Sequence, residues 1–228
     1  MSHKTASSRS EAPVRAAEIV REYGPFAGSP KVNGVSHDGR HVWAALGATL
    51  IAFDPASGET TRTLDYAADA GTAFDGEHLW QIAEARIDKI DPATGRVLAS
   101  IPAPGGSGSG LAWAEGSLWV GQYRSRQIKQ LDPATGAVLR TIETNRFVTG
   151  VTWVDGELWH GTWEGDESEI RRIEPESGAV LERLEMPHGT AVSGLESDGA
   201  DLFYCGGGSS GKVRAVRRPT GQRQGEKR

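Results

Sequence analysis

Residues 150–184 read GVTWVDGELWHGTWEGDESEIRRIEPESGAVLERL, and the same order of glycine, apolar stretch, turn, aromatic residue and second turn recurs along the chain. Five glycines open the copies, and an aromatic residue follows each of them after nine positions. These pairs are Gly34 and Trp43, Gly71 and Trp80, Gly110 and Trp119, Gly150 and Trp159, and Gly194 and Phe203. Five identical offsets indicate a repeat protein. The spacing of 37 to 44 residues between glycines is typical of four-stranded propeller blades.

Each repeat predicts four short strands. In the fourth copy we expect them at residues 151–154, 158–163, 169–173 and 179–184. Asp155-Gly156 favours a tight hairpin, because both residue types tolerate positive φ. A second turn with an early proline and a final glycine precedes the outer strand in four copies, at Asp54-Pro55, Asp91-Pro92, Asp132-Pro133 and Glu174-Pro175. The sequence therefore predicts an all-β, five-bladed β-propeller whose blades start near residues 34, 71, 110, 150 and 194.

The two ends of the chain predict how the ring closes. The fifth repeat lacks its fourth strand, since residues 212–217 are followed by Pro219 and a polar tail. Residues 17–24 form an orphan strand at the other end, and pairing it with the last blade would cover an exposed edge. An open solenoid would need capping repeats, which the sequence does not show. We therefore expect one domain over residues 17–219, with disordered tails at residues 1–16 and 220–228.

Composition narrows the functional classes. The 228 residues are 37% hydrophobic, enough for one core, and the net charge of −5 is spread along the chain. Nucleic-acid binding would need a basic face, and no apolar run reaches membrane-spanning length. Cys205 is the only cysteine, and the first 18 residues have no apolar segment of a secretory signal. We expect a cytoplasmic monomer that binds neither nucleic acid nor membrane.

The candidate binding site lies at the mouth of the central channel. Inner strands line that channel, so the residue before each repeat glycine should approach it. These five positions, called here the mouth residues, are Asn33, Ala70, Ser109, Thr149 and Ser193. All are small and four are polar, which leaves room for a small molecule or a peptide. The structural alternative is that small side chains merely fit a crowded centre.

The stretch after each repeat aromatic supplies further candidates. Trp163 is an additional tryptophan that the repeat does not require beside Trp159. Together with Tyr123 and Gln122 it could bind a substrate. Glu84, Glu164 and His160 are the candidate acid–base groups. His160 could instead pack between blades, and Glu164 could belong to a solvated acidic loop.

Two other features carry weaker signals. Cys205 suits a small buried filler better than a nucleophile, because no basic partner is identifiable. Residues 206–211, Gly-Gly-Gly-Ser-Ser-Gly, share only composition with phosphate loops and open no helix. We interpret them as a glycine hairpin beside the channel mouth. The histidines form no recognisable metal cluster, so we expect neither metal nor cofactor.

The repeats resemble those of the plant-type glutaminyl-peptide cyclotransferases, a five-bladed propeller family. Residues 158–164, Leu-Trp-His-Gly-Thr-Trp-Glu, are similar to that family's Leu-Tyr-Gln-Leu-Thr-Trp segment. Gly194-Leu195 and Asp198-Gly199 match its Gly-Leu-x-x-Asp-Gly. The similarity extends over most of residues 34–219, and streptogramin lyases share the repeat more distantly, in a seven-bladed ring.

The resemblance implies an enzyme that acts on a small amide or peptide at the channel mouth. The family's Gly-Glu-Gly motif carries its catalytic glutamate, and this chain has Ala70-Gly71 at that position. Glu84 and Glu164 are the carboxylates that could replace it. The alternative is a non-catalytic propeller that binds a ligand or a protein through the same mouth.

Overall fold

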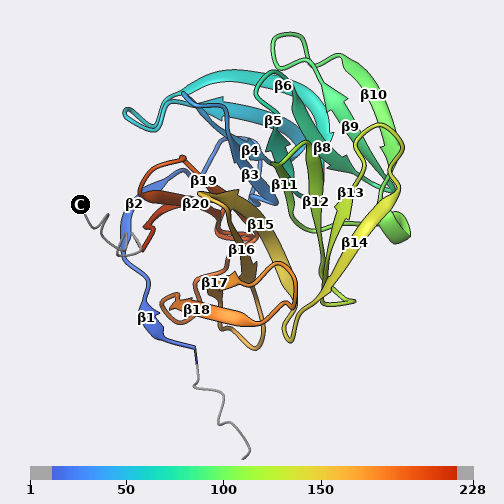
Figure 1. The fold of residues 1–228 in the computed structure, drawn as a ribbon. Helices are drawn as coiled ribbons and strands as arrows, with labels where there is room; N and C mark the ends of the chain where they lie inside the picture. Colours follow the sequence, from blue (N-terminus) through green and yellow to red (C-terminus); the bar gives the residue numbers. More distant parts are fainter. Residues whose placement is uncertain (1–11, 220–228) are drawn as a thin grey trace, which may run out of the picture.

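Each repeat folds into a four-stranded antiparallel sheet, and the five sheets stand around a central axis (Figure 1). The computed structural model describes residues 12–219. Blade 1 contains β3 (Gly34–His37), β4 (Val42–Ala45), β5 (Gly47–Phe53) and β6 (Thr60–Ala68); blade 2 contains β7 (Thr72–Phe74), β8 (Leu79–Ala83), β9 (Arg86–Ile90) and β10 (Val97–Pro102). Blade 3 contains β11 (Leu111–Ala114), β12 (Ser117–Gln122), β13 (Gln127–Leu131) and β14 (Val138–Glu143); blade 4 contains β15 (Val148–Val154), β16 (Glu157–Thr162), β17 (Glu169–Ile173) and β18 (Val180–Glu185). Blade 5 contains β19 (Gly194–Ser197), β20 (Leu202–Gly206), β21 (Val213–Arg217) and, from the other end of the chain, β2 (Ile19–Tyr23). The predicted all-β, five-bladed architecture is confirmed.

The turns follow from their residues. Asp155 and Gly156 have φ of 53° and 77°, so both central residues of the β15–β16 hairpin have positive φ. In blade 1 the turn is longer, and the Asp38 carboxylate accepts the main-chain N–H groups of Arg40 and His41. The same carboxylate accepts a 2.8 Å hydrogen bond from Nε1 of Trp43. Trp80 bonds to Asp75 in the same way in blade 2, so in these two blades the turn aspartate is joined to the repeat tryptophan.

The repeated aromatic residues form the contacts between blades. Trp43, Trp80, Trp119, Trp159 and Phe203 are all at most 3% exposed. Trp159 of blade 4 packs against Phe203 of blade 5 at 5.0 Å between ring centroids. Trp119 of blade 3 stacks on Trp153 of blade 4 at 5.1 Å. The predicted burial of this repeat position is confirmed.

The glycines that open the repeats touch one another around the axis. A Cβ atom on Gly110 would lie 2.7 Å from Cα of Gly150, and one on Gly194 would lie 2.7 Å from Cα of Gly34. Gly34 contacts Gly71 and Gly71 contacts Gly110 in the same way. Real Cβ atoms essentially never approach another atom within 3.0 Å. We call these five residues the glycine ring; it sets how closely the inner strands meet.

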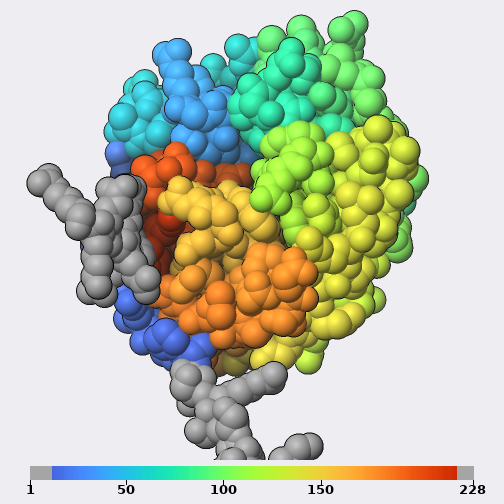
Figure 2. Space-filling view, in the orientation of Figure 1, coloured from blue at the N-terminus to red at the C-terminus, as the bar shows by residue number. Residues whose placement is uncertain are grey.

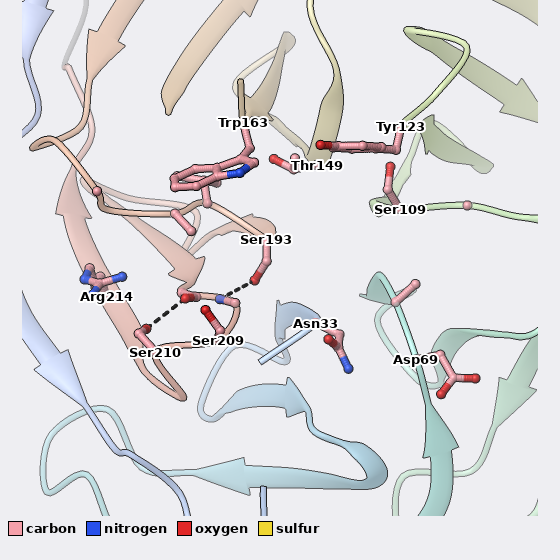
Figure 3. Close-up of a pocket in the computed structure, with 17 residues that line it drawn as sticks. Asn33, Asp69, Ser109, Tyr123, Thr149, Trp163, Ser193, Ser209, Ser210 and Arg214 are labelled. Carbon is pink, nitrogen blue, oxygen red and sulfur yellow. Dashed lines mark hydrogen bonds between the residues drawn. The ribbon is translucent and has the colours of Figure 1, made fainter. Parts of the chain in front are cut away.

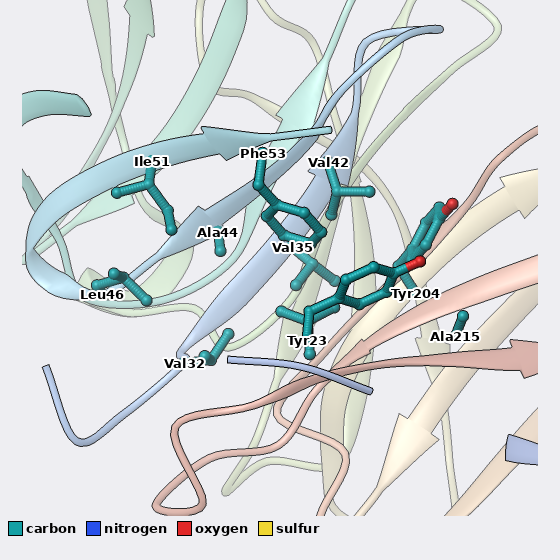
Figure 4. Packing of buried hydrophobic residues seen from close by; sticks show 11 residues of the cluster. Tyr23, Val32, Val35, Val42, Ala44, Leu46, Ile51, Phe53, Tyr204 and Ala215 are labelled. Carbon is teal, nitrogen blue, oxygen red and sulfur yellow. The ribbon is translucent and has the colours of Figure 1, made fainter. Parts of the chain in front are cut away.

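The N-terminal strand closes the propeller. β2 pairs antiparallel with β21, with Tyr23 opposite Val213, and supplies the missing outer strand of blade 5. Tyr23 also reaches blade 1, where its ring packs 4.8 Å from that of Phe53 and its hydroxyl donates to the carbonyl of Pro55 (Figure 4). Figure 1 shows β2 beside the strands of the last blade, and in Figure 2 the blue N-terminal segment lies against the orange surface of blade 4. The predicted closure is confirmed.

The first described residues depart from the sequence-based expectation. β1 (Val14–Ala16) pairs in parallel with β18 and adds a fifth strand to blade 4. The expected disordered tail is therefore wrong for these three residues, because the open edge of β18 offers them hydrogen-bonding groups. The remaining tail positions, 1–11 and 220–228, lie outside the described residues. Between residues 12 and 219 no helix is long and apolar enough to cross a membrane.

Closure by β2 predicts a strong dependence of stability on the N-terminus. Deleting residues 1–24 removes β2, exposes the edge of β21 and uncovers the pocket around Phe53, so we expect aggregation or a much lower melting temperature. Deleting residues 1–17 removes β1 but keeps β2, and serves as the control with a small effect. Differential scanning calorimetry of both truncations checks this. Equal melting temperatures for the longer truncation and the parent would contradict it.

Glu196 is the only acidic residue in the five inner strands. Its Oε1 atom accepts a 2.5 Å hydrogen bond from the Thr152 hydroxyl and a 2.8 Å bond from the main-chain N–H of Ser197. Burial raises the pKa of the Glu196 carboxyl to about 7, against the lowering effect of these two bonds. The folded protein therefore retains a proton there that the unfolded chain releases at lower pH.

Because the pKa of Glu196 is raised in the folded protein, we expect the free energy of unfolding to fall as pH rises. Between the unfolded pKa of 4.5 and the folded value of about 7, the native state binds more protons than the unfolded state, so the free energy of unfolding decreases by about 3 kcal/mol. Glu196→Gln should remove this decrease and be more stable than the parent above pH 7. Urea unfolding from pH 5 to 8 measures it, with the exposed Glu59→Gln as the matched control. Parallel stability curves for parent and E196Q would refute the assignment.

Candidate functional site

The mouth residues line one pocket at the end of the channel where the inner strands begin (Figure 3). Its volume is about 490 Å³, within the range of small-molecule sites. The glycine ring follows each mouth residue directly in sequence, so the pocket lies where the inner strands separate from their closest approach. Space for a ligand is therefore created at the mouth.

Three mouth residues also donate side-chain hydrogen bonds to main-chain carbonyl groups. Ser109 donates a 2.6 Å hydrogen bond to the carbonyl of Val148 at the start of blade 4. Ser193 donates to the carbonyl of Val32 across the closure, and its oxygen accepts the N–H of Gly208 at 2.8 Å. Asn33 makes a longer bond, 3.5 Å, to the carbonyl of Ala68.

Thr149 differs from these three. Its side chain is buried at the pocket wall, yet its Oγ1 atom has no hydrogen-bond partner among residues 12–219. A buried hydroxyl without a partner carries a desolvation penalty. Thr149 lines the pocket, so a hydroxyl without a protein partner lies in the pocket wall.

Tyr123 and Trp163 form an aromatic wall. Each follows directly after the second strand of its blade, and Figure 3 shows Thr149 lying between the two rings. Tyr123 stacks on Phe147 at 4.6 Å between ring centroids. Trp163 is partly buried and has no ring contact with another described residue. One ring is thus fixed by packing, while the indole is free to stack on a ligand.

Glu164 lies behind this wall rather than in the pocket. Its Oε1 atom lies 3.1 Å from Nη2 of Arg126 and accepts the N–H of Phe147 at 3.2 Å. Arg126 in turn lies over the Phe147 ring, and the Tyr123 ring stacks on that ring. Glu164 therefore contacts residues that pack behind Tyr123 and does not line the pocket.

Glu84 and Gln122 do not reach the pocket lining either. Glu84 sits at the tip of the β8–β9 hairpin with φ of 54°, where its exposed carboxylate pairs with Arg86 at 3.2 Å. The Gln122 amide donates a 2.6 Å bond to the carbonyl of Ser107. Hairpin geometry and this local bond direct both side chains to partners outside the pocket.

His160 is packed inside blade 4. It is fully buried, and Nδ1 donates to the carbonyl of Gly161 at 3.2 Å, since a carbonyl only accepts. Burial, together with the charge of Arg171, lowers the pKa of His160 to about 4. The imidazole is neutral near pH 7 and does not line the pocket, so the structure does not support an acid–base role there.

The pocket contains one carboxylate that the sequence reasoning missed, Asp69. Its repeat position, two before the ring glycine, is occupied by Val32, Val148 and Val192 in three other blades, all of them buried. Asp69 is exposed at the pocket lining and has no hydrogen bond or ion pair with another described residue. A charge where other repeats place valine was the signal in the sequence.

Arg214 is the one cationic residue of the lining. It stands on β21, and Figure 3 places it across the pocket from Asp69. Its Nε donates a 2.7 Å bond to Glu22 of the closing strand, whereas its buried Nη1 has no partner within the described chain. Opposite charges therefore face the pocket from opposite sides.

The glycine hairpin after β20 does border the mouth. Gly207, Gly208, Ser209 and Ser210 all line the pocket. Cys205, the residue before the hairpin, is fully buried, and burial raises the pKa of its thiol to about 12. A protonated, enclosed thiol is not a nucleophile. Residues 12–219 contain no group of three or more His, Cys, Asp or Glu side chains that could share a metal ion.

Solved structures share this architecture at low sequence identity. Glutaminyl cyclase from Myxococcus xanthus superposes with a TM-score of 0.72 at 18% identity, over 91% of this chain and 98% of that one. The WD40 repeats of RRP9 give 0.55 at 10% identity, over 91% and 99%. Hydrazine synthase from Kuenenia stuttgartiensis gives 0.50 at 16% identity, over 88% and 60%. At such identities the likeness establishes the fold.

Sequence comparison identifies the family. No curated protein matches the chain. The family model described as outer membrane protein assembly factor BamB matches residues 73–228, well over half of the 228 residues. The chain therefore belongs to this family of propeller proteins.

Proposed function

We propose that the chain binds a small amide or a short peptide in the mouth pocket and processes it, as an enzyme of the glutaminyl-cyclase-like propeller type. The observation that carries the proposal is the joint presence in one pocket of a carboxylate, an aromatic wall and a buried hydroxyl without a partner: Asp69, Tyr123 with Trp163, and Thr149. The fold likeness to a glutaminyl cyclase supports the same class of substrate.

Asp69 is the proposed proton-transfer group. It is the only carboxylate of the lining, whereas Glu84, Glu164 and His160 are held elsewhere by their own partners. Asp69 directly precedes Ala70, which occupies the position of the catalytic glutamate in the resembling family. A carboxylate displaced by one residue still faces the same mouth.

The proposed reaction closes a ring within an N-terminal glutaminyl residue. The α-amino nitrogen attacks the side-chain amide carbon, a new C–N bond forms, and the bond to the amide nitrogen breaks. Asp69 accepts the proton from the attacking amine and returns it to the nitrogen that leaves as ammonia. Thr149 and Asn33 are placed to hydrogen-bond the amide, and Trp163 to stack on its plane.

Asp69→Asn tests the reaction. The asparagine keeps the shape but cannot accept the proton, so we expect ammonia release from glutaminyl-alanine to fall about a hundredfold or more. Asp65→Asn, the same change at an exposed aspartate of β6 outside the pocket lining, is the matched control. Mass spectrometry of the peptide measures the loss of ammonia. If the parent binds the dipeptide and releases no ammonia, the proposed reaction fails and a non-catalytic binder remains.

Trp163→Ala tests the binding mode. Loss of the stacking surface should weaken glutaminyl-alanine binding about tenfold. The melting temperature of the ligand-free protein should hardly change, because the indole makes no ring contact or hydrogen bond with described residues. Calorimetric titration and thermal denaturation check both, and Trp163→Phe should retain most of the affinity. An unchanged dissociation constant for the alanine variant would exclude the indole from the site.

A further inference from the structure

Arg214 occupies a repeat position that is apolar in the other four blades. In the pairing of β20 with β21 it lies opposite Cys205, the second residue after the repeat aromatic Phe203. The same pairing of second and third strands in blades 1 to 4 places buried apolar residues at this position, namely Leu50, Ile87, Ile128 and Ile170. Nε of Arg214 bonds to Glu22, whereas its Nη1 has no partner in the described chain.

Arg214 and Ser209 both line the mouth pocket on the side of the glycine hairpin. Neither the hydroxyl nor the main-chain N–H of Ser209 bonds to another described residue. Gly207 of the hairpin packs directly against the guanidinium, since a Cβ there would lie 2.6 Å from Nη1 of Arg214. Ser210 donates its hydroxyl proton to the carbonyl of Gly207 at 2.8 Å, which fixes the hairpin (Figure 3). Nη1 of Arg214 and the two donors of Ser209 therefore have no acceptor in the described chain, whereas Nε of Arg214 and the Ser210 hydroxyl are already bonded.

From this arrangement we infer that the side of the pocket formed by Arg214 and Ser209 is a carboxylate subsite. The inference rests on the proposed use of the pocket as a ligand site and specifies the ligand. Arginine N–H groups match the two oxygens of a carboxylate, and a buried, unpaired guanidinium N–H is stabilised by such an acceptor. Arg214 is 8% exposed and Thr149 is 7% exposed, so the two unpartnered polar groups are both built into the wall.

Charge favours a carboxylate over a phosphate. Glu22 is shared by Arg214 and Lys212, each at 2.7 Å, so the carboxylate of Glu22 faces two cations. One positive charge remains in this group, which suits a singly charged anion. Asp69 on the opposite side favours a positively charged amino group. A short peptide or amino-acid derivative with a free amino group and a free carboxylate satisfies both sides.

Calorimetric titration with two probes tests the subsite: glutaminyl-alanine, which has a free carboxylate, and glutaminyl-alaninamide, which has a neutral amide in its place. For the parent we expect the free acid to bind about tenfold more tightly, because its bond to the guanidinium is charge-assisted. Arg214→Gln should bind both probes alike. Arg217→Gln, the same change on the same strand at an exposed arginine outside the pocket lining, should keep the preference.

A second variant keeps the test decisive if Arg214→Gln does not fold. Ser209→Ala removes a hydroxyl that bonds to no described residue, so it should fold normally and lose part of the preference for the free acid. Equal binding of both probes by the parent, or no binding of either, would overturn the inference. Tighter binding of inorganic phosphate than of the dipeptide would overturn the choice of carboxylate.

The outcomes separate the subsite from the reaction. Preference for the free acid without ammonia release would support the subsite and contradict the proposed reaction. Ammonia release at equal efficiency from both probes would support the reaction and contradict the subsite.

Discussion

The close contact of five glycines around the axis governs both the fold and the site. No side chain fits at Gly34, Gly71, Gly110, Gly150 or Gly194, because a Cβ atom at each would overlap the inner strand of the next blade. The inner strands therefore meet at these points, and wider space lies one residue earlier, where the mouth residues line the pocket. The repeat that packs the blades thus also fixes where a ligand can bind.

A repeat protein offers an internal standard for detecting function. Positions that only pack should be interchangeable between blades, so a departure indicates another requirement. Valine recurs two residues before the ring glycine, and Asp69 replaces it in blade 2. The third strands of blades 1 to 4 carry a buried apolar residue where blade 5 carries Arg214: Leu50, Ile87, Ile128 and Ile170. Both departures fall on the same pocket.

The sequence predicted the ring because turns, glycines and aromatic residues repeat at fixed offsets, and each has a local physical cause. The candidate acid–base residues could not be placed in this way. Alternate residues of a strand face different neighbouring blades, and nearby hydrogen-bond or ion-pair partners determine where each side chain points. His160 points into blade packing, Glu84 turns to Arg86 at a hairpin tip, and Glu164 is bound to Arg126. The pairing of Val14–Ala16 with β18 was not predictable either, since three exposed residues show no strand periodicity.

The closing strand connects the stability of the ring to the chemistry of the pocket. β2 completes blade 5 through main-chain pairing, and the same strand brings Glu22 to Nε of Arg214. A guanidinium held by one edge has its remaining N–H groups fixed in direction, because its atoms are coplanar. Ser193 adds a second link, since it bonds to Val32 across the closure while it lines the pocket. The residues that join the two ends of the chain therefore also orient one wall of the candidate site.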